Sequence, residues 1–472
     1  MVRFIELFKP LTRFFPDVKA AQRRVAFNEK LFWTAIVLIV YLVMSEIPLY
    51  GIGRKGAQDP FGALRVIFAS NRGTLMELGI GPIVTAGLIL QVLAGSKMIN
   101  VDFTNPDDRM LFTSASKVLA VVMVVFEACA YIIGGAYGAI SVQIQFAILL
   151  QLIAAGVILM LLDELLQKGW GIGSGISLFI AAGVAQRIWW DLVSPLGPME
   201  DNKYYGSILA FGQSIWMGQD ITDIFYRPAG FPDMIGLATT VIVFIIIIYM
   251  NGLRVEVPVS YAKYRGYRGK FPIKLLYVSN IPVIFAAALF GNIYFVSQLI
   301  WQNYNRESTN FWLNLIGQFS IISERYEPSG GLVYYVVPPR NLNGVLQDPF
   351  RAAMYAGLMI AVCIFFAVTW VEVGGMDSRT VAKQLLDSGM QIEGFRRSHV
   401  PIQQVLERYI PTVTVLGGLI VGAIASFADF LGAFGSGTGI LLTVGILEQY
   451  YQLLVRERIT EMYPAVRAVL GK

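Results

Sequence analysis

Ten long apolar runs constrain this sequence more than any other feature. Of its 472 residues, 56% are hydrophobic and 15% are charged, whereas about a quarter of an average globular domain is charged. A helix of about 20 apolar residues crosses the hydrocarbon core of a bilayer. The chain is therefore predicted to be an all-α polytopic membrane protein. The predicted spans are residues 31–48, 75–95, 117–138, 145–166, 171–189, 234–253, 275–299, 352–372, 410–429 and 433–455.

The placement of lysine and arginine predicts the orientation. With the N-terminus in the cytoplasm, the cytoplasmic segments hold 26 of the 37 Lys and Arg residues, and the outer segments hold 11. Cytoplasmic loops carry the excess of positive charge in membrane proteins, so both termini are predicted to be cytoplasmic. The predicted parts are a cytoplasmic segment (1–30), a first half (31–190), an outer loop (191–233), a second half (234–455) with cytoplasmic loops at 254–274 and 373–408, and a cytoplasmic tail (456–472).

The number of spans allows two halves of opposite orientation. Each half has five spans, so the second half starts on the other side of the membrane, as in the inverted repeats of transport proteins. The second span of each half contains a proline, Pro82 in GPIV (81–84) and Pro282 in IPVI (281–284). Interrupted spans at corresponding positions point to a working site. We expect both spans to be broken at these prolines.

The stretch from Asp59 to Gly95 has two unlike parts. Residues 61–69 are amphipathic, and a helix of about a dozen residues is only about 18 Å long, too short for a bilayer core of about 30 Å. The span that follows opens on Gly79, Gly81 and Pro82. Taken alone, this pattern favours a surface turn before a kinked span over an element that moves or lines a path.

The sequence offers little material for catalysis or ion coupling. Cys129 and Cys363 lie in apolar spans and His399 in a polar loop, so no metal site, cofactor or catalytic set is expected, and the chain is not predicted to be an enzyme. The glycine-rich run 435–439 lacks a phosphate-binding lysine and is interpreted as a place of close helix approach. A secondary transporter of small solutes with an inverted 5+5 repeat remains the alternative. It would need polar groups converging at the midplane, where Glu127 is the clear acid.

Two cytoplasmic loops are candidates for docking. Residues 254–274 hold six Lys and Arg residues and one acid, with aromatic residues between them, and residues 373–408 include GFRRS. Ordinary positive-inside charge explains most such loops. A surface for something anionic, such as ribosomal RNA, would use the same residues to neutralise phosphates and stack on bases. For the first loop the two interpretations have equal weight. The outer loop 300–350 carries no interpretable motif.

Long stretches of the chain resemble one family. They are GIGPIVTAGLILQ (79–91), LLDELLQKGWGIGSGISLFIAAG (161–183), PIKLLYVSNIPVI (272–284), GFRRS (394–398), ERYIP (407–411) and FLGAFGSGTGILLTVGILEQYYQLLVRE (430–457). These segments are similar to the SecY family, which includes the α subunit of the eukaryotic endoplasmic-reticulum channel, and the archaeal form is favoured. The resemblance implies ten transmembrane helices in two pseudo-symmetric inverted five-helix halves around a central hourglass pore, with a short plug helix and a hinge in the outer loop 191–233.

The resemblance also implies which residues form the channel. A ring of aliphatic side chains would narrow the pore, and such a ring gates by dewetting and forms no directional bonds with a passing chain. Its members would be Ile80, Val84, Ile176, Ile180, Ile284 and Leu442. The plug would be residues 59–70, with Asp59, Phe61, Leu64, Ile67 and Phe68. A polar cluster of Thr85, Glu127 and Asn292 would lie across a lateral gate between the second and seventh spans.

The function implied is that of the central pore-forming subunit of the Sec translocation channel. It would pass unfolded secretory polypeptides across the membrane and release transmembrane segments sideways into lipid. The implied partners are small membrane subunits of the SecE/γ and β types, signal sequences and nascent chains, the lipid bilayer and the translating ribosome. Ribosome docking is assigned to Arg254, Lys263, Arg265, Arg268, Lys270, Arg396 and Arg397. The implied location is the plasma membrane, or the endoplasmic-reticulum membrane if the source is eukaryotic.

Overall fold

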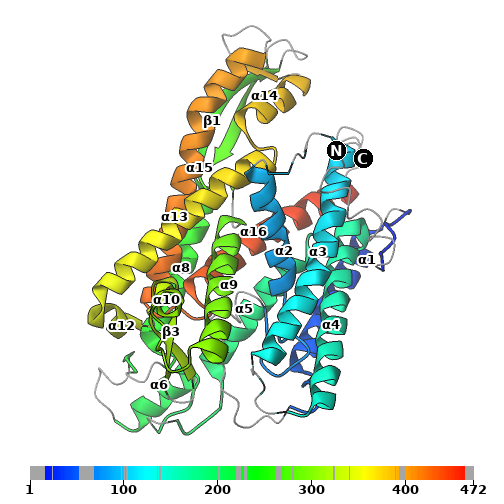
Figure 1. Cartoon of the computed structure of the whole chain (residues 1–472). Coiled ribbons are helices and arrows are strands. Elements are labelled where there is room, and N and C mark those ends of the chain that lie inside the picture. Colours follow the sequence, from blue (N-terminus) through cyan, green and yellow to red (C-terminus); the bar gives the residue numbers. More distant parts are fainter. Residues whose placement is uncertain are drawn as a thin grey trace.

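A computed structural model describes most of the chain, and it is mostly helical. The described residues are 16–23, 25–52, 69–96, 98–99, 101, 105–134, 137, 140–199, 202–218, 225–227, 231–261, 267–278, 281–322, 325–339, 341–388, 390–392 and 399–462. The long helices are α1 (Phe27–Glu46), α2 (Gly81–Gly95), α3 (Pro106–Ile133), α4 (Val142–Leu165), α5 (Gly175–Val193), α8 (Met234–Gly252), α9 (Ile281–Tyr304), α13 (Pro349–Val373), α15 (His399–Phe430) and α16 (Gly437–Met462). They stand side by side in a tilted bundle (Figure 1).

A helix occupies each of the ten predicted spans. Among the described residues, eight helices are long and apolar enough to cross a membrane. The two others are α2, whose 15 residues give a length of about 22 Å, and α16, whose second half is polar (EQYYQLLVRERITEM). The structure therefore describes a multi-pass membrane protein, and the number of ten crossings stays a prediction.

The expectation of two proline-broken spans is wrong. Pro82 is the second residue of α2 and Pro282 is the second residue of α9, so each proline lies in the first turn of its helix. Proline is tolerated there because the N–H that it lacks would have no partner within the helix. Residues 75–80, predicted as part of the second span, form turns instead. The two prolines still occupy corresponding places, as helix starts rather than breaks.

A three-stranded sheet lies at one end of the bundle, and it was not predicted. Its order is β2-β1-β5, made of β1 (Arg254–Tyr261), β2 (Tyr267–Lys274) and β5 (Met390–Ile392), all antiparallel. Figure 1 shows β1 and α14 (Ser378–Asp387) beside the ends of α13 and α15. Val257 and Ile273 are buried in a hydrophobic cluster with residues of these three helices. The two basic loops of the sequence analysis thus form one platform.

Short elements cover the other end. They are α6 (Ser207–Trp216) in the outer loop 191–233, then α10 (Phe311–Ile316), the hairpin of β3 (Gln318–Ile322) and β4 (Arg325–Gly330), α11 (Leu332–Val336) and α12 (Asn341–Gln347). The largest hydrophobic cluster lies at the middle of the bundle and includes residues of α1, α2, α5, α9 and α16. It contains the candidate ring.

Candidate functional site

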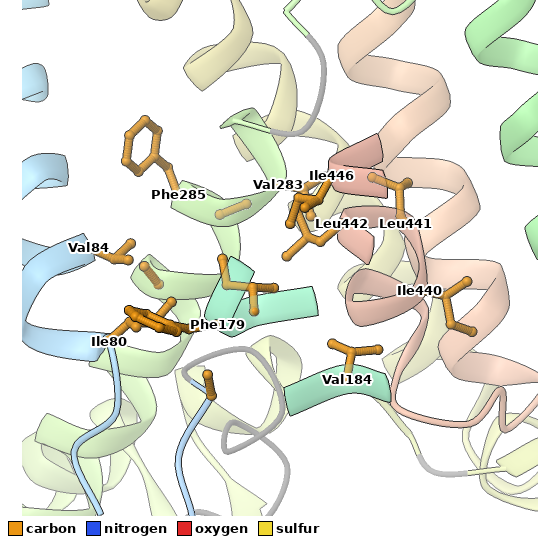
Figure 2. Close-up of a cluster of buried hydrophobic side chains, with 14 of the residues drawn as sticks. Ile80, Val84, Phe179, Val184, Val283, Phe285, Ile440, Leu441, Leu442 and Ile446 are labelled. Atoms are coloured by element: carbon orange, nitrogen blue, oxygen red, sulfur yellow. The ribbon is translucent and has the colours of Figure 1, made fainter. Parts of the chain in front are cut away.

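The six residues assigned to the ring come together in one hydrophobic cluster. Ile80, Ile180 and Leu442 have no exposed surface, and Val84 is 7% exposed. Ile176 and Ile284 are partly buried and pack against the same cluster. Figure 2 shows side chains of α2, α5, α9 and α16 meeting there. The arrangement agrees with a closed constriction, while the role of each residue stays a prediction.

All six ring residues lie at the beginnings of helices. Ile80 directly precedes α2, and its carbonyl accepts a hydrogen bond from the Val84 N–H at 3.0 Å. Ile176 and Ile180 are the second and sixth residues of α5. Ile284 is the fourth residue of α9, and Leu442 is the sixth of α16. Four helices therefore start close to the middle of the bundle, and their first two turns line the candidate pore.

A buried aspartate positions the start of α5. Asp163, near the end of α4, accepts hydrogen bonds from the Ile176 N–H at 3.0 Å, the Ser174 hydroxyl at 3.2 Å and the Gln167 side chain at 2.8 Å. A Cβ atom on Gly175 would lie 2.7 Å from the Asp163 Cα, so this close approach requires glycine. The carboxylate satisfies backbone and side-chain donors that a helix start leaves open. It thereby fixes the first ring residue of α5.

A second aspartate does the same for α16. Asp429, at the end of α15, accepts from the Gly437 N–H at 2.6 Å and from the Tyr355 hydroxyl at 3.0 Å. A Cβ atom on Gly437 would collide with the Ala425 carbonyl and the Ala428 side chain. The prediction that the glycine-rich run 435–439 allows close helix approach is confirmed.

The three residues assigned to the polar cluster also meet. The Asn292 side chain on α9 donates to the Thr85 hydroxyl on α2 at 3.2 Å. Thr85 in turn is hydrogen-bonded to the Glu127 carboxyl on α3. Glu127 is 8% exposed, and its Oε1 has no hydrogen-bond partner among the described residues. The structure brings these side chains together between α2, α3 and α9, and their function as a gate stays a prediction.

The plug residues Asp59, Phe61, Leu64, Ile67 and Phe68 lie outside the described residues. The chain after them is described from Ala69, and it is fastened to α1. The Tyr41 hydroxyl donates to the Ala69 carbonyl at 3.1 Å, and the Asn71 side chain donates to the Ser45 carbonyl at 3.2 Å. The Tyr41 ring stacks on Phe179 of the ring cluster, with centroids 4.8 Å apart. The sequence analysis missed Tyr41 because nothing distinguishes it within its apolar run.

Only some of the assigned docking residues can be placed. Lys263, Arg265, Arg396 and Arg397 lie outside the described residues, and only the backbone of Arg268 is described.

Among the others, Arg254 is exposed on β1, whereas Lys270 forms an ion pair with Glu256 across the hairpin. Lys274, which was not assigned a role, pairs with Glu448 of α16 at 3.1 Å. Two of the loop's positive charges are therefore paired with carboxylates of the same chain.

A hydrogen bond joins the chain just after the hairpin to the turn between α13 and α14. The Tyr277 hydroxyl donates to the Met376 carbonyl at 2.9 Å, and burial together with the nearby Asp377 charge raises the pKa of Tyr277 to about 12. The hydroxyl therefore keeps its proton at neutral pH and the bond persists. Within the described residues, no group of three or more His, Cys, Asp or Glu side chains is placed to hold a metal ion.

Comparisons with known proteins agree with this arrangement. The SecY family model matches residues 74–451, and the model of the plug domain of Sec61p matches residues 39–73. The chain is 45% identical to the protein translocase subunit SecY of Pyrococcus furiosus, with 99% of each chain covered. It is also 45% identical to the protein transport protein Sec61 subunit alpha of Dictyostelium discoideum, with 97% of each covered. Since these two identities are equal, the archaeal assignment stays a prediction.

Solved structures give the same result. One described as a protein-conducting channel superimposes with a TM-score of 0.83 at 38% identity, covering 97% of this chain and 99% of that one. Sec61 in the canine ribosome–channel complex superimposes with a TM-score of 0.80 at 38% identity and the same coverage. With a family model across most of its length and relatives of nearly equal length, the chain belongs to the SecY family.

Proposed function

We propose that this chain is the pore-forming subunit of a protein-conducting channel. It passes unfolded secretory polypeptides across the membrane and releases transmembrane segments sideways into lipid. The observation that carries the proposal is the buried aliphatic cluster built from the first two turns of four helices. Aliphatic side chains exclude water when the ring is closed and hold no passing sequence by directional bonds. A transporter of small solutes would need polar groups at this position.

The residues assigned to the ring are packed in one buried cluster, so the proposed passage requires movement of the helices around it. Ile80, Ile180 and Leu442 have no exposed surface, which leaves no path between them for a polypeptide. The first turns of α2, α5, α9 and α16 must separate. The plug, residues 59–70, is proposed to seal the outer side of the same constriction, and the family model of a plug domain covers those residues.

Site-specific cross-linking tests the channel. Ile80, Ile180 and Ile284 are replaced one at a time by cysteine, and a ribosome-arrested nascent chain with a single cysteine is presented to the channel. We expect adducts from all three positions. Ile148→Cys is the matched control, because Ile148 is equally buried but belongs to a different cluster between α3 and α4. Adducts only from position 148, or from no position, would contradict a protein-conducting path.

Lateral release is assigned to the contact between α2 and α9. These helices lie against each other, and the Asn292–Thr85 hydrogen bond joins them. Polar contacts between transmembrane helices contribute about 0.6–2 kcal/mol each. That is enough to favour a closed gate and small enough for an apolar signal helix to overcome.

The cytoplasmic platform is the proposed ribosome-docking surface. Its hairpin packs on a buried core shared with α13, α14 and α15. Structural relatives include Sec61 in a ribosome–channel complex and a yeast Ssh1 complex bound to the ribosome. Both observations support the assignment of Arg265 and Arg397 to docking.

Charge reversal tests this assignment. The double variant Arg265→Glu, Arg397→Glu is expected to bind ribosomes more weakly, and most clearly at raised salt, where the remaining phosphate contacts are screened. Arg109→Glu, together with Arg458→Glu, makes the same change of net charge on the cytoplasmic side but outside both cytoplasmic loops. Equal ribosome binding by both double variants in a co-sedimentation assay would contradict docking at Arg265 and Arg397. The charge of these loops would then be explained by the positive-inside rule alone.

A further inference from the structure

The outer segment between α9 and α13 holds two short helices with unusual surfaces. The chain leaves α9 at Tyr304 and enters α13 at Pro349, and both are among the helices able to cross a membrane. Between them, α10 has the sequence FWLNLI, with no charged residue, and α12 has the sequence NLNGVLQ. Both helices are too short to give a periodic signal in the sequence.

The polar side of α10 is tied to the end of α9. Asn305, the first residue after α9, is 3% exposed, and its side chain donates to the Asn314 side-chain oxygen at 2.7 Å. The Asn305 side-chain oxygen accepts from the Asn310 N–H at 3.1 Å. The Asn314 amide donates to the Ser308 carbonyl at 2.8 Å. This closed network fixes how α10 is rotated with respect to α9.

The opposite side of α10 is apolar and uncovered. Phe311, Trp312 and Leu315 share one helical face and are 67%, 74% and 52% exposed. Tyr304, the last residue of α9, is 80% exposed beside them in sequence. Because Asn305 and Asn314 hold the polar side inward, these large side chains are kept outward by the fold.

The helix α12 leads directly into a membrane-crossing helix. Leu342 and Leu346 are exposed one turn apart on α12, and Phe350 and Met354 are exposed one turn apart at the start of α13. Only Asp348, whose backbone is not helical, separates the two helices. The exposed apolar side chains of α12 are therefore followed at once by those of a membrane-crossing helix. Next to Leu342 and Leu346 on α12, Asn343 and Gln347 form an exposed polar row.

We propose that α10 and α12 lie in the outer membrane–water interface and contact lipid headgroups and the adjoining acyl chains. An apolar row beside a polar row is the pattern of a helix that lies in the interface plane. Trp and Tyr gather at that depth because their rings are apolar and their N–H or O–H groups remain hydrated. Lipid is identified as the occupant because α10 carries no charged residue and α12 leads directly into a membrane-crossing helix whose first exposed side chains, Phe350 and Met354, are apolar.

One consequence rests on the proposed lateral gate. Since Asn305 and Asn314 join α10 to the end of α9, a sideways movement of α9 must carry Phe311 and Trp312 through the interface. The lipid composition of the outer leaflet would then influence how readily the gate opens.

The proposal is tested by locating single fluorescent labels. Leu315→Cys and Leu346→Cys are each labelled with an NBD maleimide in a Cys129→Ala background, since Cys363 is buried. The channel, with its small subunits, is placed in phosphatidylcholine nanodiscs. Nitroxide attached near the headgroup of the lipid and aqueous iodide are the two quenchers. Glu307→Cys, exposed and close to α10 in sequence, is the control.

The expected result is quenching by the lipid nitroxide at positions 315 and 346 that exceeds quenching at position 307 by about threefold or more. Iodide should act most strongly at position 307. Quenching of positions 315 and 346 by iodide would place them in water and overturn the proposal. Shielding from both quenchers would mean that a protein partner covers them, which also overturns it. The measurement uses the resting channel, so it stands apart from whether the chain conducts polypeptides.

Discussion

The connection from α4 to α5 and the connection from α15 to α16 have similar local structures. They differ in which helix supplies the tyrosine hydroxyl that bonds to each. In each, an aspartate of the first helix accepts the backbone N–H at the start of the second, next to glycines that allow close approach. At the first connection, the Tyr450 hydroxyl of α16 donates to the Ser174 carbonyl at 2.7 Å. At the second, the hydroxyl that reaches Asp429 comes from Tyr355 of the neighbouring α13.

The difference concerns the two proposed halves. Tyr450 and Ser174 belong to different halves, so their bond is stretched when the halves separate. Tyr355 and Asp429 belong to the same half, so their bond is not affected by that movement. One connection is therefore expected to respond to opening, while the other holds its half together.

Removing the aspartates is expected to have the largest effect. Asp163→Ala leaves three hydrogen-bond donors without their acceptor, and Asp429→Ala leaves two. A buried donor without a partner costs about 1–3 kcal/mol. We expect both variants to unfold at lower temperature, Asp163→Ala more so, as measured by circular dichroism of the detergent-purified complex. Asp163→Asn keeps an acceptor oxygen and should lie between Asp163→Ala and the unmodified chain. A larger loss for Asp429→Ala would contradict the ranking.

Removing single hydroxyl groups should affect channel leak at one connection and not at the other. Tyr450→Phe and Tyr355→Phe each delete one hydrogen bond, worth about 1 kcal/mol. Only Tyr450→Phe is expected to raise the ion conductance of the resting channel in planar bilayers, because its bond crosses between the halves. If Tyr355→Phe leaks as much, the distinction between the two connections is lost.

The Asn292–Thr85 bond crosses the same boundary on the gate side. Asn292→Ala removes about 0.6–2 kcal/mol of contact between α2 and α9. We expect apolar test helices to enter the bilayer at a lower hydrophobicity threshold, measured as the inserted fraction. Asn303→Ala is the matched control, since Asn303 lies exposed on the same helix and donates to the Leu299 carbonyl of that helix. An unchanged insertion threshold for Asn292→Ala would show that this hydrogen bond does not hold the gate closed.

A surface ion pair between the halves should matter least. Lys30 of α1 pairs with Glu457 of α16 at 2.9 Å, and partly exposed pairs contribute about 0–1 kcal/mol. Lys30→Met is expected to lower the unfolding temperature slightly at low salt and not at high salt, because salt screens the pair. The charge-swapped variant Lys30→Glu, Glu457→Lys should restore the unfolding temperature at low salt. A loss that does not depend on salt would point to packing instead.

The sequence predicted the features that depend on composition and failed on those that depend on distant contacts. Apolar length located a helix at each predicted span, and the small residues at 435–439 indicated close helix approach. The sheet was missed although Val255, Val257 and Val259 alternate as in a strand. Pro258 and the six Lys and Arg residues of the stretch 254–274 suggested a surface loop, and β5 joins from over a hundred residues away.

The helix starts were missed for a related reason. A proline within an apolar run suggests a break, and only packing decides that the helix begins there. The link between Asp163 and Ile176 spans a π-helical turn, η3 (Leu166–Trp170), and a chain reversal. Pattern analysis does not follow a chain through such a reversal, so the support of the ring became visible only in the structure.

The four helix starts around the ring also have an electrostatic consequence. The dipole of each helix is equivalent to about half a positive charge at its start, so the four together bring about two positive charges close to the constriction. Asp163 and Asp429 each accept the N–H of one of these starts, at α5 and α16. Their carboxyl oxygens therefore offset part of the positive potential around the ring. A weaker potential holds acidic stretches of a passing polypeptide less strongly, which suits a passage that must accept any sequence.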